Sequence, residues 1–202
     1  MRYFRRQATC SCASVATRRR QHLGCCASLL LLLCFTLAIA GTLWEEERQR
    51  LTIGMRLFPA VLAADLNLSQ RRDADGQLQV LILHDGQHEA AAQVQRALQA
   101  LASVQQHPLE VQIVTLEQLS EYPQRPIAAI FVAAPIAQRG LYPRLLSDYS
   151  TLTFSPFDGD VERGAVAGIR ITDRILPLVN LEQAEQAAIA FKPFFLRVAA
   201  TR

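Results

Sequence analysis

Short apolar runs alternate with amphipathic stretches through the middle of the chain. Residues 87–106 carry apolar side chains at helical spacing, and residues 140–150 predict a shorter helix. Four apolar runs have the length and composition of buried strands, namely residues 78–84, 109–116, 127–135 and 151–155. The order strand, helix, strand, helix, strand predicts an α/β fold: a single three-layer domain around a mostly parallel sheet.

The two ends of this domain follow different patterns. Residues 43–62 show helical spacing, and Pro59 is expected to kink or restart that helix. Residues 165–172 and 174–181 are short β-like runs that predict a C-terminal hairpin, followed by a helix over 181–190. The final segment, FKPFFLRVAA, is apolar and amphipathic. It could dock on its own domain or form the interface of a homodimer.

The first forty residues have the composition of a targeting segment. They contain six arginines and no acid, and an apolar run leads to Ala38 and Ala40, an A-x-A pair before Gly41. This pattern predicts a cleaved secretory signal over residues 1–40 and a folded domain over 41–202. The alternative is an uncleaved membrane anchor, because Leu23 to Trp44 is long enough to span a bilayer and carries no charge. Both alternatives place the domain outside the cytoplasm.

Charge and cysteine usage exclude several function classes for the folded part. All five cysteines lie within the first 34 residues, so residues 41–202 hold no thiol for a nucleophile, a thiolate metal site or a disulfide. Six of the 21 basic residues also lie in residues 1–40, which leaves 15 basic against 18 acidic residues in the remainder. No basic stripe follows residue 40, and nucleic-acid binding is therefore not expected.

An acidic, glycine-rich stretch follows the fourth strand. Asp158, Asp160 and Glu162 alternate like the first ligands of an EF-hand loop, but the glycine and the final glutamate of such a loop are missing. A looser carboxylate site remains an alternative. The favoured interpretation is a solvated turn into the hairpin, with glycines supplying positive φ.

A second polar cluster, HDGQHE (residues 84–89), ends the first strand. His84, Asp85 and His88 lie where ligands bind in parallel α/β sheets, and they could also support a divalent metal or acid–base chemistry. The structural alternative is that Asp85 caps the next helix. No HExxH, P-loop or nucleophile elbow is present. We expect no cofactor, no bound metal and no catalysis.

From Phe154 onward the chain resembles the YfiR-like family of periplasmic proteins. The matching residues are GAVAGIRI (164–171), Arg174, LPLVNL (176–181), the helix that follows, and FFLRVA (194–199); upstream, GMRLFPAVL (54–62) and LQVLILH (78–84) are also similar. The resemblance implies a periplasmic repressor of an inner-membrane signalling protein such as a diguanylate cyclase, which lowers cyclic di-GMP and restrains biofilm formation. This chain departs from the family's namesake, which depends on disulfides, because its folded part has no cysteine. Control by disulfides within this domain is therefore excluded.

Three function hypotheses follow. In a regulator, Asp160, Arg163 and Arg170 would belong to a partner-binding face, where arginines contact carboxylates or phosphates. In a small solute-binding protein, His84, Asp85 and Asn180 would hold a ligand at the strand ends. In a metal-dependent enzyme, the HDGQHE segment would supply the ligands.

Overall fold

The described strands form one sheet of eight, in the order β2-β3-β1-β4-β5-β6-β7-β8. The computed structural model describes residues 45–122 and 125–202, and Glu46–Arg202 make up one compact unit. The predicted signal or anchor lies outside these residues. The strands are β1 (Leu78–His84), β2 (Ser103–Val104), β3 (His107–Thr115), β4 (Ala129–Val132), β5 (Leu152–Ser155), β6 (Ala167–Ile171), β7 (Ile175–Val179) and β8 (Ala200–Thr201).

Most of the sheet is parallel, as predicted. β1 lies between β3 and β4 and is parallel to both, and β5 and β6 continue the parallel series. The predicted C-terminal hairpin is confirmed, because β7 runs antiparallel to β6 with Ile171 opposite Ile175. The short strands β2 and β8 close the two edges.

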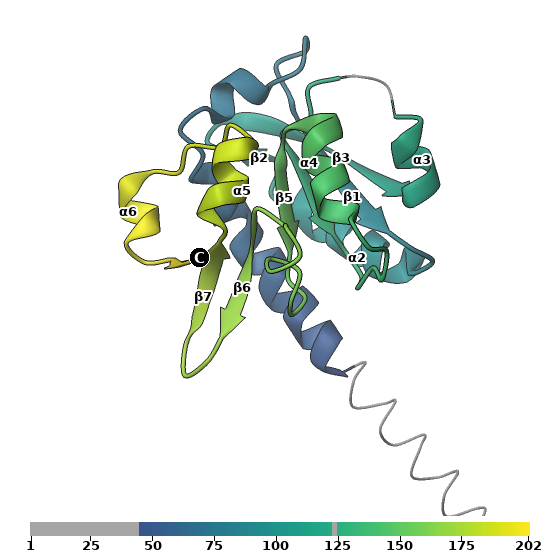
Figure 1. Ribbon diagram of the computed structural model, residues 1–202. Coiled ribbons are helices and arrows are strands. Elements are labelled where there is room, and N and C mark those ends of the chain that lie inside the picture. The colour runs from purple at the N-terminus through teal and green to yellow at the C-terminus, as the bar shows by residue number, and fades with distance from the viewer. Residues whose placement is uncertain (1–44, 123–124) are drawn as a thin grey trace, which may run out of the picture. The chain divides into compact units, whose positions relative to one another are not determined.

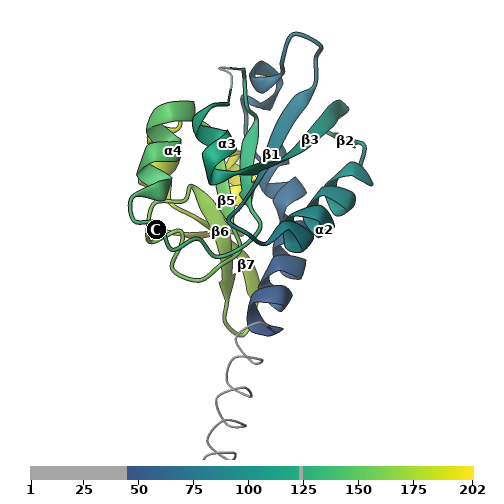
Figure 2. The same ribbon diagram turned by 90° about the vertical axis from the view of Figure 1, so that its right-hand side faces the viewer.

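Helices cover both faces of the sheet. They are a helix over residues 45–63, α2 (His88–Gln99), α3 (Leu116–Ser120), α4 (Leu141–Tyr149), α5 (Leu181–Gln186) and α6 (Pro193–Leu196), with a 3-10 turn η1 (Leu68–Arg71). The helix over 45–63 and α2 lie on one face, and α3 and α4 lie on the other (Figures 1 and 2). The α/β fold with three layers is therefore confirmed.

Three phenylalanines join the N-terminal helix to the centre of the sheet. The ring of Phe58 lies 5.2 Å from that of Phe131 on β4 and 5.4 Å from that of Phe154 on β5. All three side chains are buried. The predicted apolar face of the helix is thus the face that packs on the core, and the helix runs through Pro59 without the expected restart.

Two predicted helices end earlier than their patterns suggested. The helix predicted to reach Gln106 ends at Gln99, because the chain turns through Ala102, Gln105 and Gln106 at positive φ and pairs β2 with the start of β3. The helix predicted over 181–190 ends at Gln186, and the backbone turns at Ala188 with a φ of 53°. In both cases a tertiary pairing replaces the helical continuation.

The C-terminal segment docks on its own domain only in part. Phe191 and Phe195 are buried with stacked rings 5.4 Å apart, and β8 pairs with β7. In contrast, Phe194 is 59% exposed and Val198 is 60% exposed. This segment therefore contributes both to the core and to the surface.

Candidate functional site

The carboxyl end of β1 places the histidine cluster at a branch point of the sheet. The chain leaves β1 toward β3 on one side and later returns to β4 on the other, so connections diverge at this point. Such a switch point is where ligands bind in open parallel sheets. His84 closes the strand, Gly86 turns the chain with a φ of 80°, and His88 begins α2.

His84 is buried at this point, whereas Asp85 and His88 are exposed. Its ring lies edge-on to the ring of His88, with 5.6 Å between ring centroids. Burial lowers the pKa of His84, the charge of His88 lowers it further, and the carboxylate of Asp85 acts in the opposite direction. The buried imidazole is therefore neutral at neutral pH.

Two polar atoms at the end of β1 lack partners. Nδ1 of His84 and Oε1 of Gln87 are buried and make no hydrogen bond to the described residues. Asp85 does not cap α2, as the structural alternative had suggested, since the N-cap residue is Gln87 and no side chain caps the helix. Sequence reasoning singled out His84 but missed Gln87, a half-buried residue whose Oε1 is shielded from solvent.

The metal-dependent alternative receives no geometric support. Within residues 45–122 and 125–202, no three side chains of His, Cys, Asp or Glu are grouped so that they could hold a metal ion. His84, Asp85 and His88 are close in sequence, but the imidazole of His84 is buried while Asp85 and His88 are exposed.

The acidic stretch after β5 contains a buried carboxylate network. Asp160 is fully buried, and its Oδ2 accepts hydrogen bonds from the hydroxyls of Tyr142 on α4 and Ser155 on β5. Its Oδ1 pairs with the guanidinium of Arg163. Both carboxylate oxygens are thereby used by the protein itself.

This network holds the loop from Pro156 to Val166 against the sheet. Burial raises the pKa of Tyr142 to about 12, while the hydrogen bond with Ser155 and the charge of Arg163 oppose that rise. The tyrosine hydroxyl therefore stays protonated and remains a donor to Asp160. The prediction of a solvated turn holds for Asp158 and Glu162, which are exposed, but is wrong for Asp160. The predicted place of Asp160 on a partner-binding face and the looser carboxylate site are wrong as well, because both of its oxygens are used inside the protein.

The glycines of the stretch have two different roles. Gly159 and Gly164 adopt φ values of 76° and 113°, which are the turn conformations predicted for them. Gly168 has a different role, because it lets the loop and β5 pack closely against β6. A Cβ at this position would lie 2.5 Å from the carbonyl oxygen of Ser155 and 2.7 Å from Cγ2 of Val161.

Asn180 belongs to this loop and not to the histidine cluster. Its Oδ1 accepts from the backbone of Gln183 at 3.2 Å and caps α5, and its Nδ2 donates to the carbonyl of Val161 at 3.2 Å. Asn180 follows β7, and β4, β5 and β6 separate that strand from β1, which ends at His84. The predicted ligand site combining His84, Asp85 and Asn180 is wrong in this respect.

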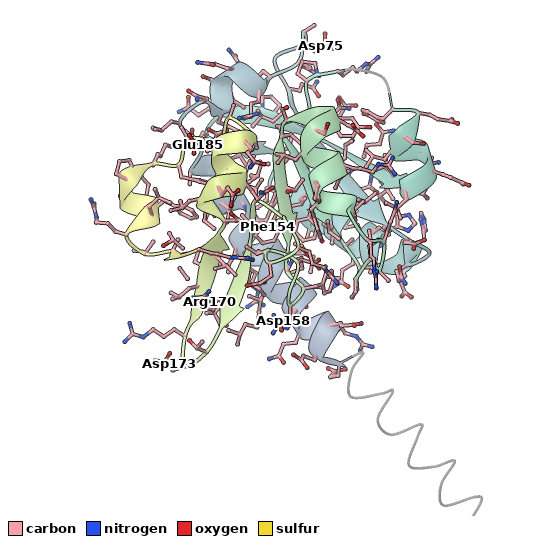
Figure 3. All side chains as sticks on the ribbon, in the orientation of Figure 1. Asp75, Phe154, Asp158, Arg170, Asp173 and Glu185 are labelled. Carbon is pink, nitrogen blue, oxygen red and sulfur yellow. The ribbon has the colours of Figure 1, made fainter. Side chains whose placement is uncertain are left out.

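Arg170 is separate from both clusters. It lies on the exposed part of the β6–β7 hairpin, close to the turn that carries Asp173 (Figure 3). In the part of the chain that the structure describes, its side chain makes no hydrogen bond and no ion pair. Arg163, in contrast, is tied to Asp160 even though half of its side chain is exposed.

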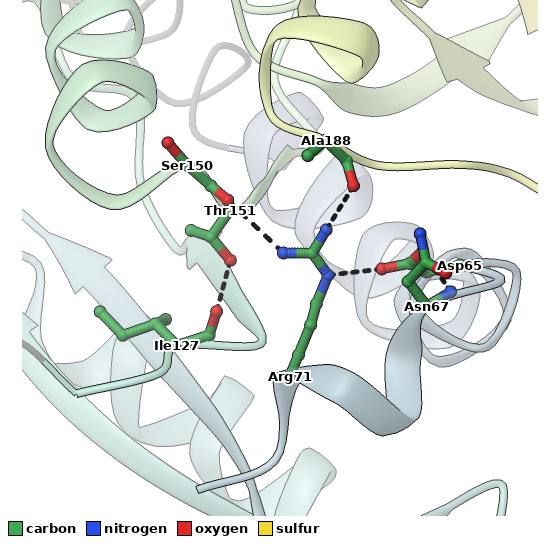
Figure 4. Close-up of polar contacts among 7 residues, drawn as sticks. All are labelled: Asp65, Asn67, Arg71, Ile127, Ser150, Thr151 and Ala188. Atoms are coloured by element: carbon green, nitrogen blue, oxygen red, sulfur yellow. Dashed lines mark hydrogen bonds and ion pairs between the residues drawn. The ribbon is translucent and has the colours of Figure 1, made fainter.

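A second buried ion pair was not predicted from the sequence. The guanidinium of Arg71 contacts Asp65 at 2.6 Å, the carbonyl of Ala188 at 2.8 Å and the carbonyl of Ser150 at 3.4 Å (Figure 4). Asp65 also accepts from the backbone of Asn67. The pair therefore links η1 to the ends of α4 and α5. No local sequence motif predicts this structural role.

Two surface hollows lie away from the predicted site residues. One, of about 340 Å³, is open and lies between α4 and α5, lined by Pro143, Leu146, Ser147, Ser150, Gln183 and Gln186. The other, of about 30 Å³, is lined by residues of α3 and α4 together with Gln138. Neither contains a residue of the histidine cluster or of the Asp160 network.

Exposed apolar side chains gather in the C-terminal third of the chain. Seven large hydrophobic residues are well exposed in the described part, and five of them fall between residues 171 and 198: Ile171, Ile175, Leu181, Phe194 and Val198. We call these five side chains the C-terminal apolar residues. The two isoleucines oppose each other at the end of the β6–β7 hairpin.

Comparisons with known proteins add little to this picture. The chain matches no protein-family model and no curated protein. Among solved structures it is similar to the ABC domain in complex with L-Trp from Streptococcus pneumonia, at 11% sequence identity and a TM-score of 0.45, over 69% of this chain and 59% of that chain. No helix of the described residues is long and apolar enough to cross a membrane.

Proposed function

We propose that this protein is a non-catalytic regulator that works outside the cytoplasm by binding a membrane signalling protein, such as a diguanylate cyclase. The observation that carries the proposal is the gathering of exposed apolar side chains in the C-terminal third. Exposed apolar patches mark sites of protein interaction, and Ile171 and Ile175 form an exposed apolar pair on the β6–β7 hairpin. The export signal and the resemblance to the YfiR-like family supply the compartment and the kind of partner.

The buried polar residues support a binding role over catalysis. Asp160 has both oxygens engaged by Tyr142, Ser155 and Arg163, so it is not free to act as a base or nucleophile. A buried network that is satisfied in this way stabilises a fold. The residues left for contact with a partner are exposed ones, Arg170 among them.

The β6–β7 hairpin is the part of this surface that reaches furthest from the core. Its turn and flanking residues, Arg170 to Ile175, are all exposed. The hairpin tip lies at the same end of the domain as the start of the helix over 45–63 (Figures 1 and 2).

The test uses variants of the surface with a matched control. Cyclic di-GMP is measured in a strain lacking the gene, and in the same strain carrying the wild type, the double variant Ile175→Asp/Phe194→Asp, or Leu101→Asp. Leu101 is 44% exposed but lies just after α2, outside the C-terminal apolar residues. Immunoblots check that the variants accumulate equally.

We expect deletion to raise cyclic di-GMP, and the wild type and Leu101→Asp to restore it. The double variant should fail to restore it and should not recover the cyclase from solubilised membranes. If deletion leaves cyclic di-GMP unchanged, regulation of a cyclase is wrong. If the double variant restores it fully, the partner binds elsewhere.

A further inference from the structure

The carboxyl end of β1 offers a second recognition site, independent of the proposed function. His84 is 5% exposed, yet its Nδ1 has no partner among the described residues, and Oε1 of Gln87 beside it also has none. An unpaired buried polar atom destabilises a fold by about 1–3 kcal/mol. Among the described residues, Nη1 of Arg50 and Oε1 of Gln79 are also buried without a partner, whereas the Asp160 network is paired.

The amino terminus of α2 lies at the same place. The helix has twelve residues, and the side chain of its N-cap residue, Gln87, does not cap it. Among the first three backbone N–H groups of the helix, only that of His88 donates a hydrogen bond, to the carbonyl of Gly86 at 3.1 Å. Uncapped N–H groups at a helix start attract a negatively charged group. The ring of His84 contacts His88, the first residue of this helix, so the unpartnered imidazole and the helix terminus are neighbours.

The side chains of Gln87, Asp85 and Glu89 favour a ligand that also carries a positively charged group or a hydrogen-bond donor. Oε1 of Gln87 only accepts hydrogen bonds, and the carboxylates of Asp85 and Glu89 are exposed beside it. A simple anion would meet these two carboxylates, and a simple cation would meet the positive end of α2. A molecule that carries both charges satisfies both sides.

We propose that the end of β1 binds a small zwitterion, in which a carboxylate contacts the start of α2 and a neighbouring ammonium donates to Gln87. Nδ1 of His84 supplies a further hydrogen bond to the ligand. Both unpartnered atoms are shielded from solvent, so entry requires residues 85–87 to move. Gly86 is the pivot for that movement, since it adopts a φ of 80° and no atom lies within 4 Å of the place where a Cβ would be.

The test compares three small probes on the compact unit, Glu46–Arg202. Glycine carries both charged groups, acetate only the carboxylate, and ethylamine only the ammonium. Each is titrated while the backbone amide signals of His88, Glu89 and Ala90 are followed by NMR. The variant is Gln87→Met, which removes the acceptor and keeps the length of the side chain. The matched control is Gln99→Met at the exposed opposite end of α2.

Glycine should shift these signals in a saturable manner and bind more tightly than acetate or ethylamine. Gln87→Met should weaken glycine binding roughly tenfold, the loss expected for one hydrogen bond to a charged group, and Gln99→Met should not. The proposal is overturned if glycine causes no saturable shift, if acetate or ethylamine binds as tightly, or if Gln87→Met binds as the wild type does. None of these outcomes depends on a cyclase partner, so the two proposals fail separately.

Discussion

Two loops that each follow a parallel strand use their polar residues in opposite ways. The loop after β5 places Asp160 in a closed network with Tyr142, Ser155 and Arg163. The loop after β1 leaves atoms of His84 and Gln87 unpaired. Both loops looked like candidate sites because both combine acids with glycine at the end of a strand. The comparison teaches that such residues mark a site only where the fold leaves them unsatisfied.

The largest effect should come from breaking the network after β5. Asp160→Ala should lower the free energy of unfolding by about 3 kcal/mol, because two buried hydroxyls and a guanidinium lose their acceptor. Urea denaturation measures the loss. Asp158→Ala, in the same loop but exposed and paired with Arg50 only at 3.5 Å, should stay within about 0.5 kcal/mol of the wild type. Equal losses of unfolding free energy in the two variants would mean that the burial of Asp160 does not make it more important for stability than the exposed Asp158.

A smaller loss should follow from Gly168→Ala, which tests how the loop packs on β6. The added Cβ would overlap the carbonyl oxygen of Ser155, and we expect a loss of about 2 kcal/mol. Gly76→Ala is the control: its φ is 80°, but no atom lies within 4 Å, so only backbone strain of about 1 kcal/mol applies. Thermal unfolding should rank the two variants in that order. The reverse order would show that the loop can move away from the strand.

The effect of pH should be smaller and should arise from the loop after β1. Because burial lowers the pKa of His84 in the folded state, the unfolded chain binds a proton first as the pH falls below about 6.5. The free energy of unfolding should therefore decrease below that pH and level off once the folded imidazole is also protonated. Burial is the largest cause of the lowered pKa, the charge of His88 adds to it, and the carboxylate of Asp85 opposes it.

Variants assign this pH dependence to one residue. Denaturation between pH 5 and pH 8 should show a flatter profile for His84→Gln than for the wild type, and an unchanged profile for His107→Gln on β3. A profile that stays the same in His84→Gln would place the titrating group elsewhere.

The smallest effect should have the opposite sign. Gln87→Met removes a buried acceptor that has no donor, so the free energy of unfolding should stay the same or rise by up to about 1 kcal/mol. Chemical denaturation in the absence of any ligand measures it. A clear loss of stability would reveal that Oε1 of Gln87 is already paired in solution, and the contrast between the two loops would disappear.

Local patterns in the sequence determined the secondary structure of the domain centre. The prediction for β1 over residues 78–84 matches the strand as observed, and the helix over 140–150 is α4 within one residue at each end. A continuous apolar run and a helical spacing are properties of neighbouring residues, so they can be read without the fold. The small helix α3 was missed, although Thr115 and Gln118 form its capping box.

The roles of the polar residues were decided by the tertiary structure. Asp158 and Asp160 are equivalent in the alternating pattern, but α4 and β5 cover only Asp160. His84 ends a strand and Asn180 follows one, yet β4, β5 and β6 separate the two strands in the sheet. Burial and strand order depend on contacts between residues far apart in the chain, and a local pattern contains no information on those contacts.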